Sequence, residues 1–144
     1  MHNGKQVLLV EDDEVIQKLI TRLCDRHGIM VTVADNQDNT NRAFADAEIF
    51  DMFFVDLILP EITGWEVLQK IKNNPACNGK PIIVFTGAIL SKNEKENILQ
   101  QATAIVEKKL FSLQLFDEIL DKNLKEHGRA RGASPGLTPV RGSG

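Results

Sequence analysis

The sequence predicts an α/β fold, with a single doubly wound sheet of five parallel strands and five helices. Five short apolar runs alternate with segments of helical periodicity. The runs lack the apolar and polar alternation of a half-exposed strand, so helices are expected to cover both faces of the sheet. The length of 144 residues, with 42% hydrophobic and 26% charged residues, fits one domain with one core.

The expected strands are the five apolar runs themselves. They cover residues 7–10, 29–34, 52–57, 81–85 and 104–107. Asp56 falls inside the third strand under these bounds. The regular order of strand and helix predicts right-handed crossovers between neighbouring parallel strands.

The first two helices are predicted from their apolar spacing. Residues 15–24 follow helical spacing, and Gly28 stands where this helix should end. A second helix has Ala43, Phe44 and Ala47 as its apolar face.

The last three helices have clearer start signals. A third helix opens after Gly64 and carries the apolar positions of residues 65–71. Ser91 and Glu94 have the spacing of a capping box at the start of the fourth. Residues 113–124 give the fifth.

Charge and composition divide the chain into two parts. Residues 1–126 are expected to form the domain, and residues 127–144, rich in glycine, proline and arginine, a disordered tail. The net charge is −3, and the tail holds three arginines and no acid, so the domain carries −6. That charge argues against a nucleic-acid-binding surface. Residues 7–10 are too short for a signal-peptide core or a membrane span, which predicts a cytoplasmic protein without membrane contact.

The cysteines and histidines suggest no further chemistry. Cys24 lies on the apolar face of the first helix and Cys77 in an expected loop, so no disulfide framework is predicted. His2, His27 and His127 show no ligand spacing and are expected at the surface.

Charged and hydroxyl side chains stand at the carboxyl ends of four expected strands. They are Glu11, Asp12 and Asp13 after the first strand, Asp56 in the third, Thr86 after the fourth and Lys108 after the fifth. Ligands bind at this edge of an open parallel sheet. Clustered carboxylates repel one another unless a cation neutralises them, and a set of oxygen ligands suits Mg²⁺. Beside such an ion, Asp56 could act as a carboxylate nucleophile toward a phosphoryl donor.

Each of these residues also has an ordinary structural reading. Asp12 or Asp13 could simply cap the first helix, Thr86 could be a strand-end hydroxyl, and Lys108 a solvated charge. Asp56 fits such a reading less well, because an acid among apolar neighbours needs a compensating partner. The joint placement of these side chains favours a functional site.

At these residues the chain resembles the receiver domain of two-component response regulators. The motifs are VLLVEDD at the first strand and VDLILPEITGWEVL around Asp56, and the resemblance covers about residues 5–125. It implies a flavodoxin-like fold with strand order 2-1-3-4-5. It also implies that Asp56 is the phosphoacceptor, with Pro60 and Gly64 in the turn that follows.

The resemblance implies a set of metal ligands as well. Mg²⁺, or Mn²⁺ in its place, would be held by the carboxylates of Asp12 and Asp56 and by the backbone carbonyl of Ile58, with Glu11 acting through water. Asp13 is then the adjacent third acid and is expected to cap the first helix.

Thr86 and Lys108 match the switch hydroxyl and the strand-five lysine, and both are expected to contact the phosphoryl group. The chain departs from the family pattern next to each of them. Lys109 replaces the usual proline after the lysine, so the loop there is expected to be rearranged. Ile105 stands where the family usually has an aromatic switch residue, which puts the coupled rotation of hydroxyl and ring in doubt.

Two further positions tune the lifetime of the acyl phosphate in this family. They are occupied here by Ile58 and Ala88. Neither side chain can hydrogen-bond an attacking water, so slow autodephosphorylation is predicted.

The resemblance implies a phosphorelay receiver and not a turnover enzyme. No GxxxxGK loop is present for ATP, so the phosphoryl donor should be a histidine kinase or a histidine phosphotransfer protein. Phosphorylation is expected to switch the surface of the fourth helix, fifth strand and fifth helix for binding a downstream protein or an output domain outside this sequence. A phosphorylation-independent pseudo-receiver is the alternative. A phosphatase of the haloacid-dehalogenase kind is disfavoured, because Ile58 stands where that family needs a second aspartate.

Overall fold

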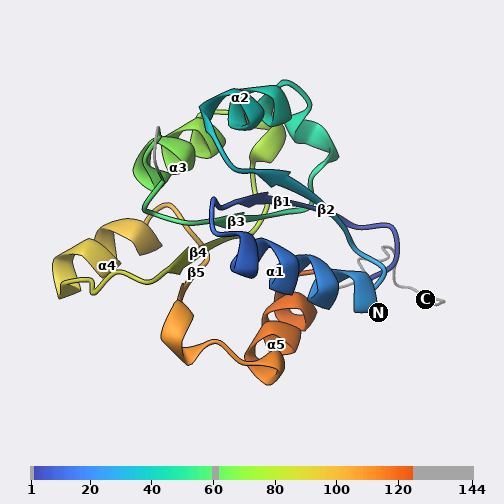
Figure 1. Cartoon of the computed structure of the whole chain (residues 1–144). Helices are drawn as coiled ribbons and strands as arrows, with labels where there is room; N and C mark the ends of the chain where they lie inside the picture. The colour runs from blue at the N-terminus through green and yellow to red at the C-terminus, as the bar shows by residue number, and fades with distance from the viewer. Residues whose placement is uncertain (1, 60–61, 125–144) are drawn as a thin grey trace, which may run out of the picture.

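The computed structural model describes residues 2–59 and 62–124, and within them the chain alternates strand and helix (Figure 1). The five strands are β1 (Gln6–Val10), β2 (Met30–Ala34), β3 (Met52–Val55), β4 (Ile82–Thr86) and β5 (Ala104–Glu107). Every neighbouring pair is parallel, and the order is β2-β1-β3-β4-β5. This order confirms the predicted fold class.

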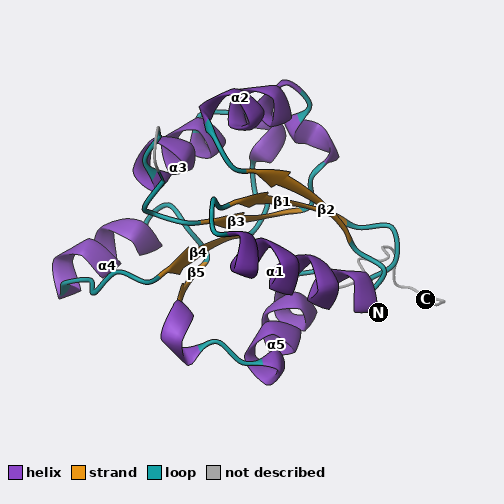
Figure 2. Cartoon of the chain, in the orientation of Figure 1, coloured by secondary structure: helices purple, strands orange, loops and turns teal. Residues whose placement is uncertain are grey.

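Helices follow each strand and cover both faces of the sheet. They are α1 (Glu14–Arg26), α2 (Gln37–Ala45), α3 (Gly64–Lys72), α4 (Lys92–Leu99) and α5 (Leu113–Asn123). Three short 3₁₀ helices add η1 (Ala47–Ile49), η2 (Pro75–Cys77) and η3 (Lys108–Leu110). Figure 2 shows α1 and α5 below the sheet and α2 and α3 above it. Among the described residues, no helix has the length and apolar character needed to cross a membrane.

The core consists of one apolar cluster on each face of the sheet. Successive strand residues point to opposite faces, so Phe53 belongs to the cluster under α2 and α3, while Phe54 belongs to the one under α1 and α5. Phe54 stacks on Phe116 of α5, with 5.7 Å between ring centroids. The central strands β1, β3 and β4 are buried on both faces, which explains their continuous apolar runs, whereas the edge strands β2 and β5 are partly exposed.

The predicted helix boundaries rest on local hydrogen bonds. Asp13 accepts from the backbone N–H groups of Val15 and Ile16 and so caps α1, as expected. Gly28 follows the end of α1 with a φ of 73°, a left-handed conformation that glycine adopts without steric cost. Ser91 forms the predicted capping box at the start of α4.

Some predicted bounds are wrong in detail. Strand β3 ends at Val55, so Asp56 is the first residue after the strand, where its carboxylate accepts from the turn that follows. Ala47 belongs to η1 and not to the second helix, which ends at Ala45. Cys77 does not lie in an open loop, because it is buried in η2; Cys24 is buried too, and both thiols are free.

The surface position predicted for the histidines is wrong for His2. Its ring is buried and lies against the end of α5. His27 is half-buried and contacts Asp117. The third histidine, the predicted tail at 127–144 and Pro60 lie outside the described residues.

Candidate functional site

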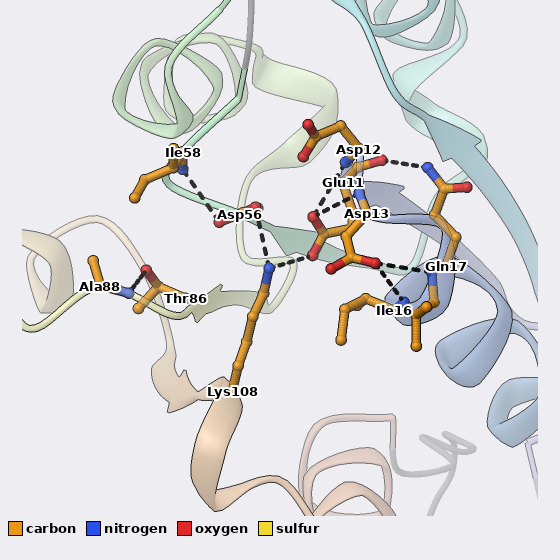
Figure 3. Close-up of polar contacts among 11 residues, drawn as sticks. Glu11, Asp12, Asp13, Ile16, Gln17, Asp56, Ile58, Thr86, Ala88 and Lys108 are labelled. Carbon is orange, nitrogen blue, oxygen red and sulfur yellow. Dashed lines mark hydrogen bonds and ion pairs between the residues drawn. The ribbon is translucent and has the colours of Figure 1, made fainter.

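The sheet brings the predicted polar residues to one edge. The register pairs Val10 with Val55 at the carboxyl ends of β1 and β3, and Val55 with Val84, two residues before the end of β4. Residues that follow these positions therefore meet at the same edge. In Figure 3 the acids that follow β1 and β3 point toward one another, and Lys108 reaches them from the end of β5.

Three carboxylates form the centre of the site. Glu11, Asp12 and Asp56 each place one carboxylate oxygen within 4.8 Å of the others. Glu11 and Asp56 are 1% and 5% exposed, whereas Asp12 is exposed to solvent. Two buried negative charges in contact need a compensating cation, and the open Asp12 side gives a cation access.

The turn after β1 is held by its own side chains. The Glu11 carboxylate accepts hydrogen bonds from the backbone N–H groups of Asp12 and Asp13, at 3.1 and 3.2 Å. From α1, Gln17 donates its side-chain amide to the Glu11 carbonyl at 2.7 Å. This role of Gln17 was not predicted from the sequence, because a glutamine on a helix surface is ordinary. These bonds fix the turn that carries all three acids, Glu11, Asp12 and Asp13.

Lys108 bridges the two buried acids. Its Nζ lies 2.9 Å from Glu11 Oε1 and 3.3 Å from Asp56 Oδ2. Burial acts to lower the pKa of Lys108, but the hydrogen bond and charge of Glu11, together with those of Asp56, raise it above its ordinary value. The side chain therefore stays an ammonium ion. The ion pair with Glu11 was not predicted, because the spacing of residues along the sequence does not show which acid a lysine at another strand end will contact.

The single ammonium does not neutralise the cluster. Burial, and after it the neighbouring Asp56 carboxyl group, raises the pKa of Glu11 to about 7, even though Lys108 lowers it. Burial next to a second acid therefore disfavours the charged form of Glu11 more than the Lys108 ammonium favours it. A divalent cation beside Glu11, Asp12 and Asp56 would favour the charged form.

The Asp56 backbone and carboxylate are fixed by the loop that follows. The Ile58 N–H donates to Asp56 Oδ1 at 3.2 Å. The Gly64 N–H donates to the Leu57 carbonyl at 3.0 Å, which ties the start of α3 to this loop. The approach is so close that a Cβ on Gly64 would lie 2.3 Å from the Asp56 carbonyl oxygen.

Thr86 lies at the end of β4 as predicted, but it does not hydrogen-bond the acids among the described residues. It is fully buried, and its Oγ1 accepts from the Ala88 N–H at 3.0 Å (Figure 3). Its hydroxyl group still has its own proton to donate. Ile105 is half-buried and packs against the cluster under α2 and α3, and the Ile58 side chain is 66% exposed.

This arrangement of fold and acids agrees with the comparison with known families. The family model for the response regulator receiver domain matches residues 7–120. The chain belongs to this family. Its members are receiver domains of two-component signal transduction. The predicted family and fold are thereby confirmed.

A solved structure supports the receiver assignment. The receiver domain of sensor histidine kinase PA1611 from Pseudomonas aeruginosa PAO1 is 27% identical to this chain. The TM-score is 0.70, and the match covers 85% of this receiver and 99% of that domain. The PA1611 domain has a magnesium ion coordinated in its active-site cleft.

Curated relatives match the receiver over different shares of their length. The two-component response regulator ORR42 of Oryza sativa subsp. japonica is 23% identical over 125 residues, which are 87% of this chain and 91% of ORR42. Chemotaxis protein CheV1 of Helicobacter pylori is 28% identical over 98 residues, which are 65% of this chain but 30% of CheV1. The chain likewise spans only 39% of the probable transcriptional regulator ycf29 of Pyropia yezoensis. The chain therefore corresponds to one part of CheV1 and of ycf29, which are longer proteins.

Proposed function

We propose that this receiver accepts a phosphoryl group from a phosphohistidine donor onto Asp56. The observation that carries this proposal is the setting of the Asp56 carboxylate. It is buried, lies beside two other acids, and has Lys108 Nζ 3.3 Å away. A buried carboxylate with a cation on one side and a second cation site on the other is suited to nucleophilic attack on a phosphoryl group.

The residues present fit a Mg²⁺ or Mn²⁺ ion. The donor set is made of oxygen atoms, and three carboxylates beside one ammonium leave negative charge that a divalent ion would compensate. Asp12, Asp56 and the Ile58 carbonyl would hold the ion, with Glu11 acting through water. Such an ion would screen the charge of the acids and of the phosphoryl oxygens. The magnesium ion of the PA1611 receiver supports this assignment.

The chain's own groups orient the reaction. The Ile58 N–H holds Asp56 Oδ1, while Lys108 contacts Oδ2. As an Asp56 oxygen forms its bond to phosphorus, the bond from phosphorus to the donor's imidazole nitrogen breaks. Lys108 would then shift its hydrogen bonds to a phosphoryl oxygen, and Thr86 would donate its hydroxyl proton to another.

Exposed apolar side chains around the acids favour a protein as the donor. Four loops or helix starts beside the site each expose one: Val15 is 73% exposed, Ile58 66%, Ile89 93% and Leu110 62%. They follow β1, β3, β4 and β5, the same strand ends that supply the acids, Thr86 and Lys108. A histidine kinase or histidine phosphotransfer protein would cover these side chains as it presents its phosphohistidine.

The output surface proposed for this receiver lies over α4, β5 and α5. A groove of about 470 Å³ runs between these elements, with Leu99, Ile105 and Leu115 in its lining. We propose residues 1–126 as the signalling unit, which binds a downstream protein or an output domain through this groove. No direct contact with nucleic acid is proposed for this unit.

The proposal is tested by intact-mass measurement after incubation with acetyl phosphate. We expect one phosphoryl adduct with Mg²⁺ present and none after EDTA treatment. Peptide mapping should place the adduct on Asp56. If Mg²⁺ stabilises the fold in a thermal melt yet neither acetyl phosphate nor phosphorylated histidine donors give an adduct, the receiver binds partners without phosphorylation. Two observations favour that alternative: the Thr86 hydroxyl oxygen is engaged by Ala88, and Ile105 supplies no aromatic switch.

A long-lived acyl phosphate is expected, because neither Ile58 nor Ala88 offers a group that can activate water. Decay of the adduct would be followed by mass after the donor is removed. The Ile58→Asn variant should shorten the half-life, because the exposed position 58 would then carry a hydrogen-bonding side chain beside Asp56. Ile89→Asn, at an exposed isoleucine in the loop after β4, is the matched control and should leave the rate unchanged. A wild-type half-life of seconds would contradict this expectation.

A further inference from the structure

The amino-terminal segment packs against the end of α1, at the opposite edge of the sheet from the acids (Figure 1). The His2 N–H donates to the His27 carbonyl at 3.0 Å, and the Gly4 N–H donates to the Gly28 carbonyl at 3.1 Å. His27 is the C-cap of α1, and Gly28 begins the turn into β2. This backbone pairing positions the His2 side chain to reach α5.

The His2 ring makes two hydrogen bonds to α5, and both partners are acceptors. Its Nδ1 lies 2.9 Å from the Leu124 carbonyl oxygen, and its Nε2 lies 3.0 Å from Asp121 Oδ1. The hydrogen bond from His2 lowers the pKa of Asp121, so that group is an ionised acceptor near neutral pH. A neutral imidazole has one N–H and can satisfy only one of these contacts. Only the doubly protonated imidazolium can donate in both contacts at once.

Within the part of the chain that the structure describes, the neighbouring His27 ring has an acceptor for only one of its two nitrogens. Its Nε2 lies 2.9 Å from Asp117 Oδ1, which takes one N–H. Its Nδ1 is buried and has no hydrogen-bond partner among the described residues. A second proton would place an N–H donor in the interior without an acceptor, which is unfavourable. The two rings are 5.6 Å apart, so one charged and one neutral ring also avoids repulsion between like charges.

We propose that protonated His2 is a pH-dependent clasp that holds the amino-terminal segment against the last turn of α5. The charged groups around the ring favour the closed form: Asp121 and, beyond His27, Asp117 are negative, and the Leu124 carbonyl belongs to the negative end of the α5 dipole. His27, in its neutral form, and the chain's amino group are the other titratable groups nearby. The proposal is independent of the phosphoryl chemistry.

Loss of the proton removes one of the two contacts. The ring then turns a nitrogen lone pair toward either the Leu124 carbonyl or the Asp121 carboxylate, and both are repelled by it. Imidazole groups change charge between about pH 5 and 8, so the clasp closes at the lower end of this range and opens at the upper end. Opening frees the last turn of α5, and earlier turns of the same helix supply Leu115 and Ile119 to the groove described above.

The first measurement is ¹⁵N NMR of the histidine rings in the folded receiver. At about pH 5.5, within the range where imidazole is largely protonated, both His2 ring nitrogens should give the shifts of protonated nitrogen. A His2 ring with a single protonated nitrogen at that pH would overturn the proposal.

The second measurement is amide hydrogen exchange of the last turn of α5 in wild type and His2→Gln, compared at the same pH so that intrinsic rates cancel. We expect exchange several-fold slower in wild type at the acidic end of the range and equal rates at the alkaline end. Asp121→Asn should reduce this difference, whereas the matched variant Asp117→Asn should keep it, because Asp117 contacts His27 and not the His2 ring. A wild-type to variant ratio that does not change with pH would show that His2 packs there without acting as a clasp.

Discussion

Replacement of Asp56 with asparagine is expected to abolish the phosphoryl adduct. Asparagine keeps the size of the side chain and the acceptor oxygen for the Ile58 N–H, but its amide has no carboxylate oxygen to attack phosphorus. The substitution also removes one of the three metal-binding carboxylates, so the rise in melting temperature on adding Mg²⁺ should shrink. Intact mass and thermal melts with and without Mg²⁺ measure both effects.

Asp13→Asn is the matched control for this experiment. Asp13 is an acid of the same site region, but its carboxylate caps α1 and is not among the three clustered groups. Asparagine caps helices about as well as aspartate, so the fold and the adduct should both be retained. An adduct of undiminished yield on Asp56→Asn would mean that another residue accepts the phosphoryl group. Loss of the adduct in Asp13→Asn would mean that the acidic turn as a whole had moved.

The sequence was sufficient for the architecture and for the acids because both depend on patterns along the chain. Apolar runs without alternation predict buried parallel strands, and a parallel sheet brings the residues after its strands to one edge. Asp12 and Asp56 follow the neighbouring strands β1 and β3, so their meeting follows from the strand order alone. Asp13 and Ser91 were likewise predictable, because a helix cap depends on the few residues after it.

The contacts that were not predicted depend on which residue of a neighbouring element a long side chain contacts. From the sequence alone, Lys108 could equally extend into solvent. Its Nζ lies nearer to Glu11 than to Asp56 because of the exact position of η3. Gln17 and His2 act through hydrogen bonds to backbone carbonyls, and a carbonyl exists at every position, so the sequence does not mark the partner. The end of β3 was misplaced because an apolar run continues past Asp56 into the loop.

The site also contains a point at which function and stability depend on the same atoms. Gly64 opens α3 directly against the backbone that carries Asp56, and an added Cβ would lie 2.3 Å from the Asp56 carbonyl oxygen and 2.4 Å from the Leu57 Cα. Both are backbone atoms, which cannot rotate away as a flexible side chain would. Either the loop after β3 or the start of α3 must therefore move. A shift of the loop would also displace the Ile58 N–H that holds Asp56 Oδ1.

Gly64→Ala is therefore expected to destabilise the receiver by about 1 to 3 kcal/mol or more, the range found when atoms are forced into a packed interior. Urea unfolding followed by Trp65 fluorescence measures this change, since Trp65 is half-buried beside the altered position. Gly87→Ala is the matched control, because a Cβ there would meet only the flexible Lys108 side chain, at 3.8 Å. The control should unfold within roughly 0.5 kcal/mol of wild type. Gly64→Ala could instead unfold at the same urea concentration as wild type and form the adduct at the same rate. In that case the loop after β3 can move without loss of stability, and its close packing against α3 does not position Asp56.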